Sequence, residues 1–239
     1  MLHEIEIENL QAYVASKTWT LNTQNNFRAD AHAFFQWCLA KPRQWVFENP
    51  AHDLPKFKIE RGIPQVLRFK EAQALMECVA EKHDGALVPY FTLALFAGIR
   101  PQAPGGELGK IAKMGEDAWD LIDSQNKVIR IPPEVSKTGE YRTINIQPNL
   151  AEWLKPFAKK KAPIVMPIDK RVKAIRKEFK LGHDVLRHTF ITFHVAKFKS
   201  VGATSLQAGN SEAIVRRHYL KMVADNEANQ FWGIKPDGA

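Results

Sequence analysis

The sequence predicts a mainly α-helical protein with one small antiparallel β-sheet, an α+β fold. Two observations lead to this prediction. Apolar residues recur at helical spacing along most of the 239-residue chain, and the period changes between residues 117 and 147, where AWDLID, KVIRI and YRTINI are short β-rich runs. An apolar content of 45% and a charged content of 25% are ordinary for a globular protein, which excludes wholesale disorder and collagen-like repetition.

The first part of the chain is expected to form a small helical domain. Between Ile7 and Ala40 the apolar residues follow helical spacing and indicate two or three helices. The segment from Glu48 to Pro64 combines three prolines, a glycine and several charges, a composition that favours a linker. We therefore expect one domain over residues 1–58 and a larger one over residues 59–239.

The larger domain is expected to have helices before and after the sheet in the sequence. Residues 86–98 form a nearly all-apolar run, which indicates a buried helix that ends at Gly98. Lys137 falls in the loop PPEVSKTGE between the second and third β-rich runs. Helical patterns are also found over residues 69–80, 150–160, 170–180, 183–198 and 212–223, with GATS and AGNS interpreted as turns before the last of them.

The positive charge is concentrated in one part of the chain. Residues 1–60 carry 6 basic and 7 acidic residues, whereas residues 150–221 carry 16 basic and 5 acidic residues, a net charge of +11. Such a field attracts polyanions and favours nucleic acid as the partner, with a merely solvated basic surface as the alternative.

Several other classes of protein are disfavoured. The longest uncharged stretch, Gly85 to Ile99, has 15 residues, short of the ~18 that suggest a membrane span. The first residues lack the layout of a signal peptide, so we expect a cytoplasmic protein that does not bind a membrane. Cys38 and Cys78 have apolar neighbours and no clustered histidines, so neither a disulfide framework nor a zinc site is indicated. The sequence also lacks a P-loop and a carboxylate metal cluster, so no metal or other cofactor is expected.

Polar residues in five short motifs form the candidate site. In chain order the motifs are FAGIR with Arg100, the hairpin loop with Lys137, HDVLRHTF with His183 and Arg187, AGN with Asn210, and RRHY with Tyr219. Taken singly, each has a structural explanation: Arg100 could cap a helix end and Tyr219 could lie at the edge of the core. Two arginines together are suited to a phosphate, because a guanidinium stays charged and donates paired hydrogen bonds.

This order resembles the catalytic domain of tyrosine recombinases, the phage-integrase family. The family has an arginine after a buried helix, a hairpin lysine, a His-x-x-Arg to which HDVLRHTF is similar, a histidine or tryptophan, and a tyrosine. The second histidine typically follows the His-x-x-Arg arginine by about 23 residues and the tyrosine comes about 9 further on, offsets at which Asn210 and Tyr219 fall. Residues 1–58, with NNFRADAHAFFQWCLA followed by ENPA, resemble the family's core-binding (SAM-like) domain, truncated at its N-terminus.

The resemblance implies a site-specific DNA recombinase or integrase that works through a 3′-phosphotyrosyl intermediate, without metal or ATP. Arg100 and Arg187 would hold the scissile phosphate and Tyr219 would attack it. His183 would be the base, and Lys137 would protonate the departing 5′-oxygen. The implied partners are double-stranded DNA and further copies of the chain, in a tetramer on DNA, in the cytoplasm of a bacterial or phage system and associated with the nucleoid.

Two departures from the family pattern bear on activity. Asn210 stands where the family has histidine or tryptophan, and asparagine can donate a hydrogen bond to a phosphate but cannot be a cation. The acidic residue expected three positions after Arg100 comes seven positions after it, as Glu107, which we expect to fold back and orient Arg100. Two alternatives therefore stay open: a catalytically weakened recombinase-like DNA-binding protein, and strand relaxation of the type IB topoisomerase kind.

The tail DNEANQFWGIKP after Tyr219 carries an apolar cluster. The resemblance suggests that this tail docks on the next protomer, and packing on its own domain is the alternative.

Overall fold

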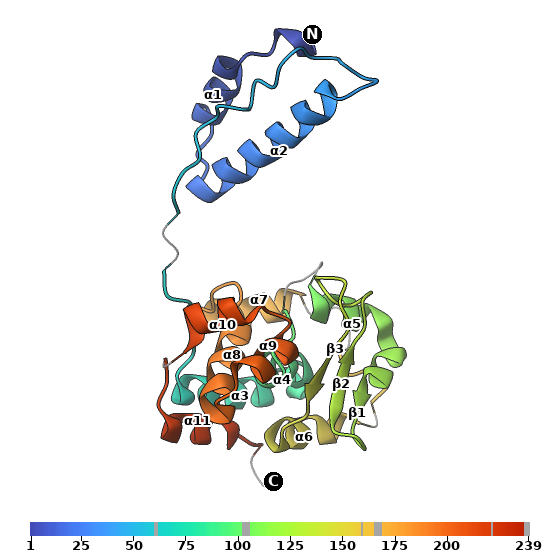
Figure 1. The fold of residues 1–239 in the computed structure, drawn as a ribbon. Helices are drawn as coiled ribbons and strands as arrows, with labels where there is room; N and C mark the ends of the chain where they lie inside the picture. Colours follow the sequence, from blue (N-terminus) through green and yellow to red (C-terminus); the bar gives the residue numbers. More distant parts are fainter. Residues whose placement is uncertain (60–61, 102–105, 159, 165–168, 221, 237–239) are drawn as a thin grey trace. The chain divides into compact units, whose positions relative to one another are not determined.

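The computed structural model describes residues 1–59, 62–101, 106–158, 160–164, 169–220 and 222–236. The chain forms two compact units, Met1–Gly62 and Ile63–Ala239 (Figure 1). The division falls inside the segment that the sequence indicated as a linker. None of the helices in the described ranges is both long and apolar enough to cross a membrane.

The first unit has a small core around one long helix. Its elements are η1 (Leu2–Glu4), α1 (Ile7–Ala15) and α2 (Leu21–Leu39). Thr20 caps α2, because its hydroxyl accepts a hydrogen bond from the backbone N–H of Thr23. The Arg28 side chain donates to the carbonyl of Leu54 (2.7 Å) and so ties the following segment to α2. The buried apolar residues are Phe35, Cys38, Val46, Ala51 and Leu54.

The second unit is built around a helix that is buried at every position. The elements before the sheet are α3 (Phe69–Glu81), η2 (Lys82–Gly85), α4 (Val88–Phe96), α5 (Glu107–Met114) and η3 (Gly115–Leu121). All nine residues of α4 are buried, and the helix packs against α6 and α8, so the prediction of a buried helix is confirmed. The helix ends at Phe96, two residues before the predicted end at Gly98. Most of AWDLID lies in η3, and only its last two residues enter the sheet.

The predicted three-stranded antiparallel sheet is confirmed. Its strands are β1 (Ile122–Asp123), β2 (Val128–Ile131) and β3 (Arg142–Asn145), in the order β1-β2-β3. Along β3 the side chains alternate between buried and exposed, so Arg142 and Ile144 share the inward face. The loop between β2 and β3 carries Lys137.

The remaining elements of the second unit are helical. They are α6 (Pro148–Leu154), η4 (Lys155–Phe157), α7 (Asp169–Glu178), α8 (Val185–Phe198), α9 (Val201–Ala208), α10 (Glu212–Tyr219) and α11 (Asp225–Trp232). The interpretation of GATS as a turn is wrong, because these residues lie in α9. The Ser200 side chain caps this helix, and the hydroxyl of Thr204 donates to the carbonyl of Ser200 (2.7 Å).

The C-terminal tail packs on its own domain. The ring of Phe231 stacks on that of Phe193 with the centroids 4.1 Å apart, and both side chains are fully buried. The indole N–H of Trp153 donates to the carbonyl of Ile234 (3.1 Å). In this structure, therefore, the apolar cluster of the tail completes the core of the second unit.

Candidate active site

Arg100 follows the buried end of α4 in a turn that requires glycine. Gly98 has a φ of 62°, and a Cβ atom at this position would lie 2.2 Å from the ring of Phe190. The backbone therefore passes directly over α8. After this turn the Arg100 side chain lies inside the domain, where it is only 12% exposed.

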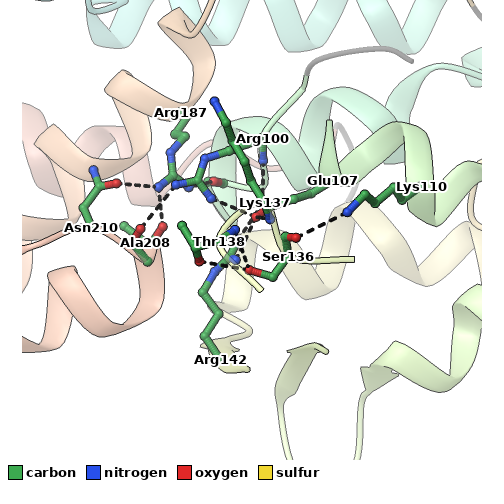
Figure 2. A network of polar contacts seen from close by, with 12 residues as sticks. Arg100, Glu107, Lys110, Ser136, Lys137, Thr138, Arg142, Arg187, Ala208 and Asn210 are labelled. Atoms are coloured by element: carbon green, nitrogen blue, oxygen red, sulfur yellow. Dashed lines mark hydrogen bonds and ion pairs between the residues drawn. The ribbon is translucent and has the colours of Figure 1, made fainter. Parts of the chain in front are cut away.

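Glu107, the first residue of α5, is fully buried at the centre of a polar network (Figure 2). Within the described residues it accepts five hydrogen bonds. Arg142 donates two, from Nη1 (2.9 Å) and Nη2 (2.6 Å), and Arg100 donates two, from its backbone N–H (3.1 Å) and Nη1 (2.8 Å). The fifth comes from the backbone N–H of Lys137 (3.2 Å). One carboxylate thus fixes the segment after α4, the strand β3 and the hairpin loop.

The surroundings of Glu107 keep its carboxyl group ionised. Burial by itself would raise the pKa of Glu107, but the hydrogen bonds and charge of Arg142, together with those of Arg100, lower it to about 2. Glu107 is therefore a carboxylate at neutral pH. The expectation that Glu107 folds back to orient Arg100 is confirmed, although four residues of the connection, 102–105, lie outside the described part of the chain.

Arg142 was not identified from the sequence. Its side chain is buried, and besides Glu107 it donates from Nε to the carbonyl of Gln207 (3.1 Å). Gly209 (φ 63°) lies so close that a Cβ atom there would be 3.2 Å from Cδ of Arg142. The signal in the sequence was the alternation in YRTINI, which puts an arginine on the same face as Ile144, and a buried arginine needs a partner.

Arg187, in the first turn of α8, is held by groups from two other segments. Its Nη1 donates to the carbonyl of Gly98 (2.6 Å), and Nη2 donates to the carbonyl of Ala208 and to Oδ1 of Asn210 (2.9 Å). Burial and then the charge of Arg100 lower the pKa of Arg187 to about 9, so the guanidinium stays charged at neutral pH. The side-chain carbonyl oxygen of Asn210 accepts this hydrogen bond from Arg187, so the NH₂ group of Asn210 can donate to another acceptor.

Lys137 is anchored at the network through its backbone. Its neighbours in the loop are held as well: the hydroxyls of Ser136 and Thr138 lie 3.2 Å apart, and Nζ of Lys110 donates to the carbonyl of Ser136 (3.3 Å). Figure 2 shows Lys137 next to Arg100, so the hairpin lysine and the first arginine lie at the same end of the network.

Tyr219, the last residue of α10, points into the domain and is 4% exposed. Its hydroxyl lies 2.7 Å from Nδ1 of His188, a residue that sequence reasoning missed although it stands in HDVLRHTF. Burial raises the pKa of Tyr219 while the charge of Arg187 opposes the rise. Burial also lowers the pKa of His188, so a protonated phenol faces a neutral imidazole at pH 7.

The contact of the Tyr219 hydroxyl involves His188 and not His183, the base that the resemblance implied. The His183 side chain is 63% exposed, and its Nδ1 lies 3.4 Å from the carboxylate of Asp184. Its match to a His-x-x-Arg motif is wrong by one position: His183 precedes Arg187 by four residues, and Asp184 stands three residues before the arginine.

The structure thus brings Arg100, Lys137, Arg187 and Asn210 close together (Figure 2). Glu107 holds Arg100 and Lys137, Arg187 holds Asn210, and the two arginines donate to the adjacent carbonyls of Gly209 and Ala208. The hydroxyl of Tyr219 contacts His188, the residue next to Arg187 in the chain. Within the described ranges no group of three or more histidine, cysteine, aspartate or glutamate residues could hold a metal ion.

Comparison with known proteins gives matches among solved structures. No protein-family model and no curated protein matches the chain. A λ integrase (residues 75–356) dimer bound to a COC′ core site is 16% identical, with a TM-score of 0.65 over 90% of this chain and 80% of that one. The Tn1549 transposon integrase in complex with a circular intermediate DNA is 12% identical, with a TM-score of 0.66 over 94% and 84%. The XerH site-specific recombinase bound to a palindromic difH substrate is 16% identical, with a TM-score of 0.61 over 97% and 71%.

These matches show that the chain has the fold of tyrosine recombinases, as the resemblance implied.

Proposed function

We propose that the protein is a site-specific DNA recombinase that cuts and rejoins strands through a 3′-phosphotyrosyl linkage. The observation that supports this most is that Arg100 and Arg187, 87 positions apart in the sequence, donate to the adjacent carbonyls of Gly209 and Ala208. The hydroxyl of Tyr219 contacts His188, the next residue after Arg187, so the tyrosine lies beside the second arginine's helix turn.

The arginine network is suited to a transition state with five-coordinate phosphorus. In that state the non-bridging oxygens carry extra negative charge, which fixed cations stabilise without reorganising. Arg100 is fixed by Glu107 and by the carbonyl of Gly209 (3.2 Å), and Arg187 by three acceptors. Both guanidinium groups are therefore in place before the substrate arrives.

The remaining residues have roles around this clamp. Tyr219 is the nucleophile, and its bond to phosphorus conserves the energy of the cleaved bond, so the reaction is reversible. Lys137 protonates the departing 5′-oxygen, a task for an ammonium group, whose pKa is more easily tuned than that of a guanidinium. Asn210 donates its amide to a phosphate oxygen while its carbonyl holds Arg187.

DNA is the partner that the charge of the second unit favours. Helix α7 carries basic residues along its length, and α10 has Arg216 and Arg217 in its last turn. Residues 150–221 carry a net charge of +11, which would neutralise backbone phosphates and make binding weaken steeply with salt. Assembly as a tetramer on DNA, and a place in the cytoplasm at the nucleoid, belong to the same proposal.

The proposal is tested with a nicked suicide duplex that carries the site selected from a random DNA library by the protein's own binding. The wild-type chain is expected to form a covalent protein–DNA adduct that resists denaturation, and Tyr219→Phe is expected to form none. Tyr141→Phe, at an exposed tyrosine of the β2–β3 loop, is the matched control and should react like the wild type.

Two other outcomes would identify the alternatives. Tight, salt-sensitive binding without any adduct would indicate a recombinase-like DNA-binding protein that no longer cuts. Relaxation of supercoiled DNA through Tyr219, with no exchange between two duplexes, would indicate an enzyme of the type IB topoisomerase kind.

A further inference from the structure

The hydroxyl of Tyr219 and the imidazole of His188 are paired inside the domain. Nδ1 of His188 lies 2.7 Å from the hydroxyl oxygen, and the two rings are tilted by 34° with their centroids 5.7 Å apart. The distance is that of a good hydrogen bond, and an aromatic pair packed in this way holds both rings in orientation.

The position of His188 on α8 explains why it meets the nucleophile. Successive residues on an α-helix project about 100° apart, so adjacent positions serve different neighbours. Arg187 turns toward Gly98 and Ala208, while His188 turns toward α10. One turn of helix therefore supplies a ligand for the phosphate and a contact for the nucleophile.

We propose that His188 is a catalytic residue, the general base that takes the phenolic proton of Tyr219 as the hydroxyl attacks the scissile phosphate. The inference rests on the proposed function and assigns the base within it. His188 touches the reacting oxygen, whereas the side chain of His183 is largely exposed and lies beside Asp184. A base must be within hydrogen-bond reach of the proton that it takes, and His188 meets this condition.

The step balances as a simple displacement. The Oη–P bond of Tyr219 forms while the bond from phosphorus to the 5′-oxygen breaks, and the phenolic proton passes to Nδ1 of His188. The leaving 5′-oxygen receives a proton from Nζ of Lys137. In the joining step both transfers run in reverse, with His188 returning its proton to Tyr219.

The charges around His188 keep it ready to accept a proton. Burial holds its pKa below the ordinary value, with Arg187, His183 and His218 acting in the same direction and the carboxylate of Asp184 opposing them. His188 is thus neutral at pH 7, and Asp184 stabilises the imidazolium that forms during the step.

The test measures single-turnover cleavage of the suicide duplex against pH for the wild type and for His188→Asn. The asparagine amide oxygen takes the place of Nδ1, so it accepts the hydrogen bond from the tyrosine but cannot take its proton. We expect His188→Asn to bind DNA normally and to cleave about 100-fold or more slowly at neutral pH, and to lose the acid limb of the pH profile. His183→Asn is the matched control and should stay within about threefold of the wild type, since its removal takes no base from the reaction.

A substrate with sulfur in place of the leaving 5′-oxygen separates the base from the acid. A thiolate leaves without protonation, so this substrate should restore cleavage by Lys137→Ala but not by His188→Asn. Restoration of cleavage in both variants would contradict the assignment, because the defect of His188→Asn would then lie in the protonation of the leaving group.

A measurement without DNA checks the pairing itself. In protein labelled with ¹³C at the ζ carbon of tyrosine, the resonance absent from Tyr219→Phe belongs to Tyr219, and it should shift when the imidazole of His188 titrates. Melting temperature and DNA affinity show whether His188→Asn folds. If it does not fold, the cleavage measurements are repeated with His188→Gln, whose amide reaches a different position.

The outcomes distinguish the two proposals. An adduct formed by His188→Asn at the wild-type rate and with the wild-type pH profile, or a Tyr219 resonance indifferent to His188, overturns the assignment of the base alone. A wild-type chain that binds its site and forms no adduct overturns the proposed function, and the base with it.

Discussion

The two halves of the candidate site are held in different ways. The arginines are fixed by many contacts: Glu107 alone accepts five hydrogen bonds within the described residues, and Arg187 is held by three acceptors. The hydroxyl of Tyr219, at the end of an eight-residue helix, takes part in one hydrogen bond within the same described residues, with His188. The arginine half of the site is therefore preorganised by many contacts, whereas the tyrosine hydroxyl is positioned by a single hydrogen bond.

The largest effect on stability is expected for Glu107→Gln. The amide cannot balance the buried charges of Arg100 and Arg142, and breaking a buried ion pair from one side costs about 3–5 kcal/mol. Urea denaturation measures the free energy of unfolding. Glu212→Gln removes an exposed pair with Arg216 and is the control, with an expected loss below about 0.5 kcal/mol. Equal losses in the two variants would show that the network is not what holds this half of the site.

A second prediction concerns the stability of the protein at acid pH. The pKa of Glu107 is about 2 in the folded protein against an ordinary value of 4.5, so its ionisation favours the folded state above pH 4.5, and this contribution is lost as the pH falls toward 2. The loss amounts to about 3 kcal/mol. Urea denaturation at several pH values should show this dependence in the wild type and a flatter one in Glu107→Gln, and parallel curves would contradict it.

An intermediate effect is expected for Arg142→Lys. An ammonium group keeps the charge but cannot donate a parallel pair of hydrogen bonds to Glu107 and a third to Gln207, and each buried acceptor left unpaired costs about 1–3 kcal/mol. The control is Arg130→Lys, at a half-exposed arginine paired with Asp123, for which at most about 1 kcal/mol is expected. Thermal unfolding compares the two, and a smaller loss at Arg142 than at Arg130 would oppose the role assigned to Arg142.

The smallest effect on stability is expected for Tyr219→Phe. Removing the hydroxyl deletes one hydrogen bond, worth about 1 kcal/mol, while the ring keeps its packing. Covalent attachment to DNA should nevertheless disappear completely. A stability loss as large as that of Glu107→Gln would mean that both halves are equally fixed, and the contrast between them would fail.

The sequence allowed the fold class to be predicted because helical and strand periods are local properties. The alternation in KVIRI and YRTINI predicted the sheet, and the apolar run before Gly98 predicted the buried helix. The helix α9 was missed, because its glycine, serine and threonine residues favour turns unless packing supports them. In the folded domain a cap at Ser200 and burial of Thr204 and Ala208 outweigh this preference.

The candidate residues show the same division between local and distant information. The order of the motifs and its resemblance to a known family singled out Arg100, Arg187 and Tyr219, because residue type and spacing can be read along the chain. Periodicity says which side of an element a residue takes, but not which group from another element faces it. The partners of Glu107 and Tyr219 come from segments 35 and 31 positions away, so Arg142 and His188 entered the site only when the chain had folded.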